Sequence, residues 1–192
     1  MNVHLGSLKA SPDSKTVTAT HGSTTVGFFV YDFNNASGAL TLRFSDVSVA
    51  GYPYSQEFSP DNKLLYYALL NNSNIYQYDL TTTTNAAFLA SRQIIGTTAN
   101  TIGYKMCALQ IAPNGKIYAA LHGKAFLGVI NDPNVMGTGC GYVDMQQDLA
   151  GRLSTLGLPA IVTSLIRPVN EIVASDSCVN RTVQLGLLDN GR

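Results

Sequence analysis

Residues 57–80 read EFSPDNKLLYYALLNNSNIYQYDL and contain a complete strand–turn–strand pattern. The proline of SPDNK (59–63) fixes φ at the first central position of a turn, and the Asp and Asn that follow accept its second half. LLYYALL (64–70) comes directly after this turn, and NIYQYDL (74–80) comes after a short polar loop. Both runs are rich in residues that favour strands. The stretch therefore predicts antiparallel strands joined by tight turns.

The same pattern occurs three times along the chain. SPDSK (11–15), SPDNK (59–63) and APNGK (112–116) are versions of one turn, at spacings of 48 and 53 residues. After each turn, a later apolar run ends in an acidic residue. These acidic residues are Asp32, Asp79 and Asp132, and they lie 18 or 19 residues after Asp13, Asp61 and Asn114 of the turns. We therefore expect three structural repeats that share one register.

Each repeat has room for four short strands. The residues before each turn form a first strand, and ALTLRF (39–44) and FLASRQIIG (88–96) are candidates for a fourth, with GCGYVDMQQ (139–147) as a weaker candidate. Four antiparallel strands in about 50 residues are typical of a β-propeller blade. The predicted fold class is all-β, with about three blades that form part of a larger propeller, since propellers close with about 4–8 blades. A β-sandwich is the alternative, but it does not require a recurring turn.

Composition excludes several classes of partner. The chain has 192 residues, with 12 basic and 12 acidic residues and no run of either sign, so nucleic acid is not an expected partner. Its apolar stretch LGLPAIVTSLI (156–166) is shorter than the roughly 20 residues of a membrane helix, so we expect no membrane insertion. The start, MNVHLGSLKAS, does not have the pattern of a signal peptide.

Several segments of the sequence resemble the repeats of one protein family. LKASPDSK (8–15), the quoted residues 57–80, LQIAPNGKIYAAL (109–121), LGVINDPNVMG (127–137) and GLPAIVTSLI (157–166) are similar to WD40-like propeller repeats. The WD40-like repeats that they resemble occur in secreted cell-surface proteins of Bacteroidota associated with gliding motility and type IX secretion. The resemblance covers about residues 5–166.

The resemblance implies a domain organisation and a location. It implies a partial propeller over 1–166, with repeats at about 1–52, 53–103 and 104–156 and a closing strand at 157–166. Residues 167–192 would then be a linker and the start of an immunoglobulin-like domain. Such proteins are extracellular and have more blades, so other blades or a second copy would complete the propeller.

One polar position recurs in the predicted first strands. Lys9, Glu57 and Gln110 each stand two residues before the residue that opens a turn. If the repeats are blades, these side chains face the central channel, where a ligand could bind them. The alternative is that Lys9 and Glu57 pair across neighbouring blades while Gln110 forms a local hydrogen bond. Glu57 could serve as a general base, but no nucleophile or paired carboxylate accompanies it at a recognisable spacing.

The other candidate residues favour structural roles. The turn residues Asp13, Asp61 and Asn114, and the strand-end residues Asp32, Asp79 and Asp132, are expected to hold turns through side-chain hydrogen bonds. His21 and His122 occupy corresponding places in repeats one and three, too far apart to share one metal ion. The sequence has no calcium-loop motif, so we expect neither a metal nor a cofactor.

Cysteines and tyrosines leave alternatives open. Cys107 is expected to be a small buried residue, whereas Cys140 and Cys178 could form a disulfide. Tyr52, Tyr54 and Tyr104 precede first strands, where they could stack on a sugar, dock a protein or pack internally. Two functions remain. The favoured one is a non-catalytic binding or scaffold module of a surface protein, with a protein or glycan at the blade rims. The alternative is a propeller lyase, lactonase or glycan hydrolase acting at the channel mouth.

Overall fold

Three antiparallel sheets make up the protein, as a computed structural model shows for residues 5–22, 27–48 and 51–159. Blade 1 contains β1 (Leu5–Ala10), β2 (Thr16–Gly22), β3 (Phe28–Phe33) and β4 (Leu40–Asp46). Blade 2 contains β5 (Pro53–Phe58), β6 (Leu64–Leu69), β7 (Asn74–Asp79) and β8 (Gln93–Thr97). Blade 3 contains β9 (Leu109–Ile111), β10 (Ile117–Ala120), β11 (Phe126–Ile130) and β12 (Tyr142–Asp148).

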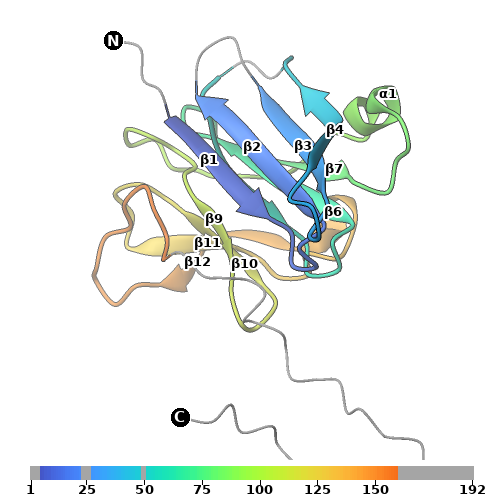
Figure 1. The fold of residues 1–192 in the computed structure, drawn as a ribbon. Coiled ribbons are helices and arrows are strands. Elements are labelled where there is room, and N and C mark those ends of the chain that lie inside the picture. Colours follow the sequence, from blue (N-terminus) through green and yellow to red (C-terminus); the bar gives the residue numbers. More distant parts are fainter. Residues whose placement is uncertain (1–4, 23–26, 49–50, 160–192) are drawn as a thin grey trace, which may run out of the picture.

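The sheets are arranged as propeller blades. Within each sheet the strands pair in chain order, from the first strand to the fourth. Strand β5 contacts both β1 and β9, so the first strands of the three blades lie side by side. Figure 1 shows the strands of blade 1, in blue to cyan, and those of blade 3, in yellow-green to orange, as separate sheets. The prediction of an all-β fold with three four-stranded antiparallel blades is confirmed.

Serine and aspartate side chains close the first two proline turns. The Ser11 hydroxyl donates a hydrogen bond to Asp13 Oδ1 at 2.6 Å and accepts one from the Thr16 N–H at 2.9 Å. Ser59 makes the same two bonds, to Asp61 at 2.6 Å and from the Leu64 N–H at 2.9 Å. Both turns pass through a positive φ, of 59° at Ser14 and 63° at Asn62.

The third hairpin is one residue shorter, which corrects the expected common register. In blades 1 and 2 the last pairs before the turn are Ala10 with Val17 and Phe58 with Leu65. In blade 3 the pair is Ile111 with Ile117. The Ala112 N–H donates to the carbonyl of Lys116, four residues on, whereas Ser11 and Ser59 donate to carbonyls five residues on. Later residues of blade 3 are therefore displaced by one position relative to the sequence alignment of the turns.

This displacement changes which residue ends the third strand. Asp32 lies opposite Thr16, and Asp79 lies opposite Leu64. In blade 3, Ile117 pairs with Ile130, so the position of these aspartates is filled by Asn131 and not by the expected Asp132. Asn131 accepts a hydrogen bond from Lys116 Nζ at 2.8 Å and donates one to the Gly141 carbonyl at 2.9 Å.

Apolar side chains fill the spaces between the blades. Aromatic residues of blades 1 and 2 form one core, in which Phe28 lies against Tyr67 and Phe44 stacks on Phe88 with ring centroids 4.5 Å apart. A second, mainly aliphatic core joins blades 2 and 3. Such side chains supply most of the stability of a protein of this kind.

A helix replaces part of one predicted strand. Residues 88–96 were expected to be a fourth strand, but α1 (Asn85–Ala90) occupies the start of that segment, and β8 begins only at Gln93. Thr84 caps the helix by accepting a hydrogen bond from the Ala87 N–H, and Ala and Leu favour helix over strand. The helix buries Phe88 in the core between blades 1 and 2. A short 3-10 helix, η1 (Gly137–Cys140), precedes β12.

Candidate functional site

Side chains from all three blades meet at the centre of the molecule. Lys9 Nζ of β1 lies 2.6 Å from Glu57 Oε2 of β5 and donates a hydrogen bond to Gln110 Oε1 of β9 at 3.1 Å. The residues occupy equivalent places on adjacent first strands, which is why one ammonium group reaches two other blades. Gln110 Nε2 also donates to the carbonyl of Ile111 at 3.0 Å. We name Lys9, Glu57 and Gln110 the channel triad.

The carboxylate of Glu57 is fully buried, and both of its oxygens accept hydrogen bonds. Besides Lys9, Oε2 accepts a hydrogen bond from the Ile111 N–H at 2.8 Å, and Oε1 accepts one from the Phe58 N–H at 3.0 Å. Burial raises the pKa of Glu57, while the Lys9 ammonium and the two N–H groups oppose this rise. These contacts join blade 2 to blades 1 and 3.

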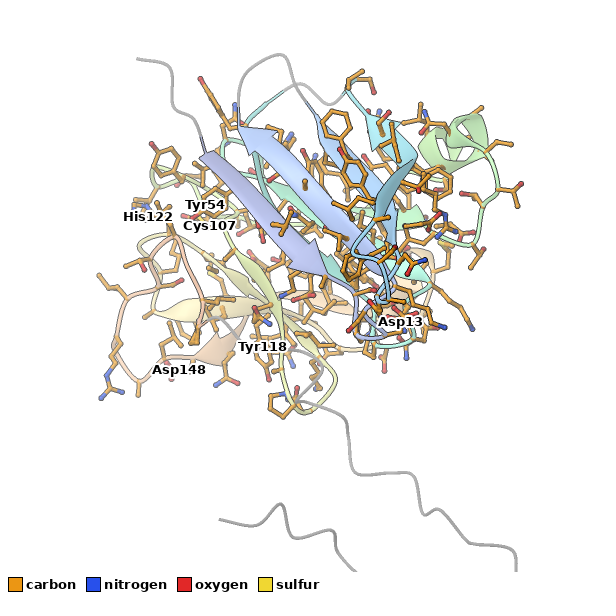
Figure 2. All side chains as sticks on the ribbon, in the orientation of Figure 1. Asp13, Tyr54, Cys107, Tyr118, His122 and Asp148 are labelled. Carbon is orange, nitrogen blue, oxygen red and sulfur yellow. The ribbon has the colours of Figure 1, made fainter. Side chains whose placement is uncertain are left out.

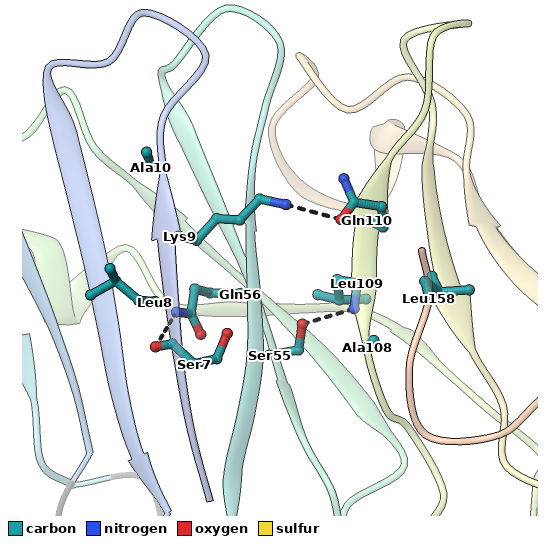
Figure 3. Close-up of a pocket in the computed structure, with 10 residues that line it drawn as sticks. All are labelled: Ser7, Leu8, Lys9, Ala10, Ser55, Gln56, Ala108, Leu109, Gln110 and Leu158. Atoms are coloured by element: carbon teal, nitrogen blue, oxygen red, sulfur yellow. Dashed lines mark hydrogen bonds between the residues drawn. The ribbon is translucent and has the colours of Figure 1, made fainter. Parts of the chain in front are cut away.

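A cavity of about 370 Å³ opens between the first strands (Figure 3). Its lining combines residues of β1, β5 and the β9 region with one residue near the end of the described chain. The lining residues are Ser7, Leu8, Lys9, Ala10, Ser55, Gln56, Ala108, Leu109, Gln110 and Leu158. Hydrogen bonds across the cavity wall join the blades, since Gln56 Nε2 donates to the Ser7 carbonyl at 3.0 Å and Leu109 N–H donates to Ser55 Oγ at 2.8 Å.

The turn residues lie at one end of the propeller. The Asp13 N–H donates to Asn62 Oδ1, and the Asp61 N–H donates to Asn134 Oδ1, each at 3.1 Å. These bonds connect the turn of one blade to the next blade. Asn114 Oδ1 accepts a hydrogen bond from the Lys116 N–H at 3.1 Å within its own turn.

The strand-end aspartates differ in their contacts. Asp79 Oδ1 accepts hydrogen bonds from the N–H and the hydroxyl of Thr81, each at 2.7 Å. Asp32 on β3 pairs with Arg43 on β4 at 3.4 Å, and the Asp32 side chain is largely exposed. Asp132 contributes backbone groups to its loop, since its N–H donates to the Cys140 carbonyl and its carbonyl accepts from the Val135 N–H. The expectation of one shared side-chain role therefore describes Asp79 better than Asp132.

The opposite end of the propeller has a loop built around one asparagine. Asn100 is buried, and its Nδ2 donates to the carbonyls of Lys105 and His122, both at 3.1 Å. Its Oδ1 accepts from the Ile102 N–H at 3.1 Å. We name residues 100–105 the rim loop. The loop exposes Ile102 and Tyr104, and the Tyr104 ring lies edge-on to the His122 ring with centroids 6.0 Å apart.

Other tyrosines of this end are partly buried. Tyr52 and Tyr54 pack against a small cluster of Leu70, Cys107 and Ala120, and Figure 2 shows Tyr54, Cys107 and His122 gathered at this end, away from Asp13. Tyr104 is the most exposed of the three tyrosines singled out from the sequence, with 44% of the residue exposed. It is therefore the tyrosine best placed to meet a partner.

Cysteine and histidine chemistry is limited in the described part of the chain. Cys107 and Cys140 are buried thiols, and burial raises the pKa of Cys107 to about 11. The side chain of His21, on β2, and residue Cys178 lie outside the described residues. Within residues 5–22, 27–48 and 51–159, no cluster of three or more His, Cys, Asp or Glu side chains is placed to hold a metal ion. None of the helices in these ranges is long and apolar enough to cross a membrane.

Comparison with known proteins gives structural similarity only. No family model and no curated protein matches the chain. It is similar to the solved structure of a candidate 6-phosphogluconolactonase from Bacteroides fragilis, with 19% identity, a TM-score of 0.49, and coverage of 70% of this chain and 39% of the other. For an auxiliary nutrient binding protein from Bacteroides thetaiotaomicron the values are 13%, 0.46, 64% and 27%.

The chain is also similar to a third solved structure. A calcium-binding protein, regucalcin, from Agrobacterium tumefaciens is 17% identical, with a TM-score of 0.43 and coverage of 64% of this chain and 40% of the other. The chain thus spans two fifths or less of the length of these three proteins. Its blades are established by the strand order and the packing described above.

Proposed function

We propose that this chain is a non-catalytic β-propeller module that binds a protein or glycan through its rim loop. The observation that carries the proposal is the exposure of Tyr104 and Ile102, at 44% and 50%, in a loop at the end of the propeller opposite the proline turns. Aromatic and aliphatic groups of this kind supply apolar contact area, and the tyrosine hydroxyl can hydrogen-bond to a polar partner.

The rim loop is held in shape before any partner binds. Asn100 bonds to the backbone of Ile102 and Lys105 within the loop and to the backbone of His122 outside it. A loop that is already ordered loses little conformational freedom when it binds, so more of its contact energy contributes to affinity. This order supports a binding role for Tyr104.

The channel triad supports a structural role for the central carboxylate. A general base must be able to reach the proton that it removes. Both oxygens of Glu57 already accept hydrogen bonds, and the residue has no exposed surface. The alternative function, a propeller enzyme at the channel mouth, would require Glu57 to give up these contacts or another group to act in its place.

The resemblance to Bacteroidota surface repeats supports the proposed setting. On that basis, we propose a secreted or cell-surface protein, of the type associated with gliding motility and type IX secretion, in which the propeller mediates adhesion. The low content of charged residues, at 12%, and the abundant polar turns are compatible with such a module.

A glycan array tests the proposal. We expect the purified chain to bind a subset of printed bacterial polysaccharides, and Tyr104→Ala to weaken this binding about tenfold or more, because a central aromatic side chain is lost. The control is Met136→Ala, which removes an exposed apolar side chain from the loop after β11, at the opposite end. Equal binding by wild type and Tyr104→Ala would contradict the role of the rim loop. Cleavage of the bound glycan by wild type would favour the enzyme alternative.

A further inference from the structure

The outward face of blade 1 has apolar positions that are covered in the other two blades. Leu8, Gln56 and Leu109 occupy the same place in β1, β5 and β9, as their pairing with Ala19, Tyr67 and Ala119 shows. Gln56 and Leu109 are 1% and 3% exposed because the preceding blade covers them. Leu8 is 74% exposed. The repeat therefore identifies a surface that is buried wherever a preceding blade is present.

Neighbouring positions show the same difference. Ala10 is exposed, whereas its counterparts Phe58 and Ile111 are buried. Tyr31 is half-buried, whereas Tyr78 at the same place in blade 2 is fully buried. The strand pairing puts further apolar side chains on this face. We name the whole set the blade 1 face, and it consists of Leu8, Ala10, Val17, Ala19, Phe29, Tyr31 and Leu42.

Blade 3 carries the complementary type of face. Gln110, Tyr118 and Val129 are neighbours across β9, β10 and β11, and Val143 lies beside Val129 on β12. These side chains occupy the face of blade 3 opposite to the one that packs on blade 2, whose residues are Leu109, Ile111, Ile117 and Ala119. Val143 is 45% exposed and Tyr118 is partly exposed, whereas Gln110 and Val129 are 9% and 2% exposed, so the open part of this face lies at Tyr118 and Val143. In blades 1 and 2, the equivalent face packs on the following blade.

We propose that a second copy of this chain packs its blade 3 against the blade 1 face, so that two copies form one six-bladed ring. The free faces of blades 3 and 1 are equivalent to the two faces that already pack between blades 1 and 2. The proposed contact therefore repeats an interface that the protein makes within itself. A head-to-tail pair related by a twofold axis satisfies both faces at once. Six blades fall within the usual range of about 4–8.

The mass in solution is the first test. Light scattering coupled to size-exclusion chromatography should give twice the 20.5 kDa of one chain at micromolar concentration. Leu8→Lys should raise the dissociation constant of the dimer at least about tenfold, because a charge is placed at the centre of an apolar contact. The matched control is Ile94→Lys, another exposed aliphatic residue in a strand, on the outer strand of the middle blade. It should leave the dimer unchanged.

A mixing experiment tests the head-to-tail arrangement. Val143→Lys should also weaken the dimer, since it alters the other half of the contact. In an equimolar mixture of the Leu8→Lys and Val143→Lys variants, one of the two contacts is unaltered in each mixed pair, so dimers should partly return. Circular dichroism checks that both variants keep the β-sheet fold.

Three results would overturn the proposal. The first is a monomeric wild-type protein, which would mean that another segment of the chain covers the blade 1 face or that the face stays open. The second is a dimer that Leu8→Lys does not weaken. The third is a dimer that is sensitive to Leu8→Lys but not to Val143→Lys, which would indicate that two blade 1 faces pack on each other.

Discussion

Lys9 joins all three blades through a single ammonium group. It reaches Glu57 on blade 2 and Gln110 on blade 3. The two charges neutralise each other in a region where neither could remain alone at low cost. Because Glu57 also accepts backbone N–H groups from its own strand and from blade 3, the channel triad fixes the relative positions of the first strands.

Replacing Lys9 should destabilise the protein strongly. We expect Lys9→Met to lower the free energy of unfolding by about 3 kcal/mol, because Glu57 is left as a buried, unpaired carboxylate. Urea denaturation at pH 7 measures the change. The double variant Lys9→Met/Glu57→Gln should recover part of the loss, since the uncompensated charge is gone. If the double variant is no more stable than Lys9→Met, the ion pair does not hold the first strands together.

Buried phenols and a buried thiol should make stability fall at alkaline pH. Burial raises the pKa of Tyr66, Tyr67 and Tyr78 above its ordinary value, and raises that of Cys107 from 9.0 to about 11. The folded protein then keeps these protons at pH values where the unfolded chain releases them. The free energy of unfolding should therefore be highest below pH 9 with respect to these groups. It should fall as pH rises above 9 through the thiol, and fall further above about pH 10 through the phenols.

Absorbance at 295 nm measures the ionisation of the phenols directly. We expect only part of the ten tyrosines to ionise near pH 10, and the rest to ionise together with unfolding. Denatured protein should titrate all ten near pH 10 and serves as the control. A native protein that ionises all its tyrosines near pH 10 while retaining its circular dichroism spectrum would show that these side chains are not buried.

Local chemistry explains which elements could be predicted from the sequence. The Ser-Pro-Asp turns and the strands around them follow from residues that are close in sequence, and both are present. The shorter third hairpin could not be read from APNGK, because it depends on the pairing of Ile111 with Ile117. Helix α1 was missed because a six-residue helix leaves almost no periodic pattern, although Thr84 is a recognisable cap.

The candidate sites also divide into residues that the sequence pattern identified and residues whose role depends on contacts in the folded chain. The approach of Lys9, Glu57 and Gln110 follows from their equal positions in the repeat, so their recurrence in the sequence was informative. Asn100 gave no such signal, because it bonds to the backbone of residues 105 and 122, and the latter is near only in the folded chain. Tyr104 was among the residues singled out, but its exposure depends on the rim loop that Asn100 holds.

Substitution at the second turn tests the contribution of its serine. Ser59→Ala removes a buried hydroxyl that bonds to Asp61 and to the Leu64 N–H, and should lower the free energy of unfolding by about 1–2 kcal/mol. Thermal or urea unfolding measures the loss. Ser37→Ala, in the exposed loop between β3 and β4, should change stability by no more than about 0.5 kcal/mol. Equal effects of the two substitutions would contradict the importance of the turn.

At the scale of the whole molecule, contacts between blades are of two kinds. Aromatic and aliphatic cores fill the space between the sheets, and polar bonds connect the first strands and the turns. The apolar cores provide most of the stability, while the polar bonds determine how the sheets are aligned. The same alignment sets the cavity at the centre and the rim loop at one end.

Nuclear Overhauser effects between first strands test the propeller arrangement most directly. Adjacent blades should give strong effects from the Ile111 amide to the side chain of Glu57, from the Leu109 amide to the β protons of Ser55, and from the side-chain amide of Gln56 to the Ser7 region. If these effects are absent while each sheet keeps its own cross-strand effects, the three sheets are not packed as adjacent blades and the propeller arrangement is wrong.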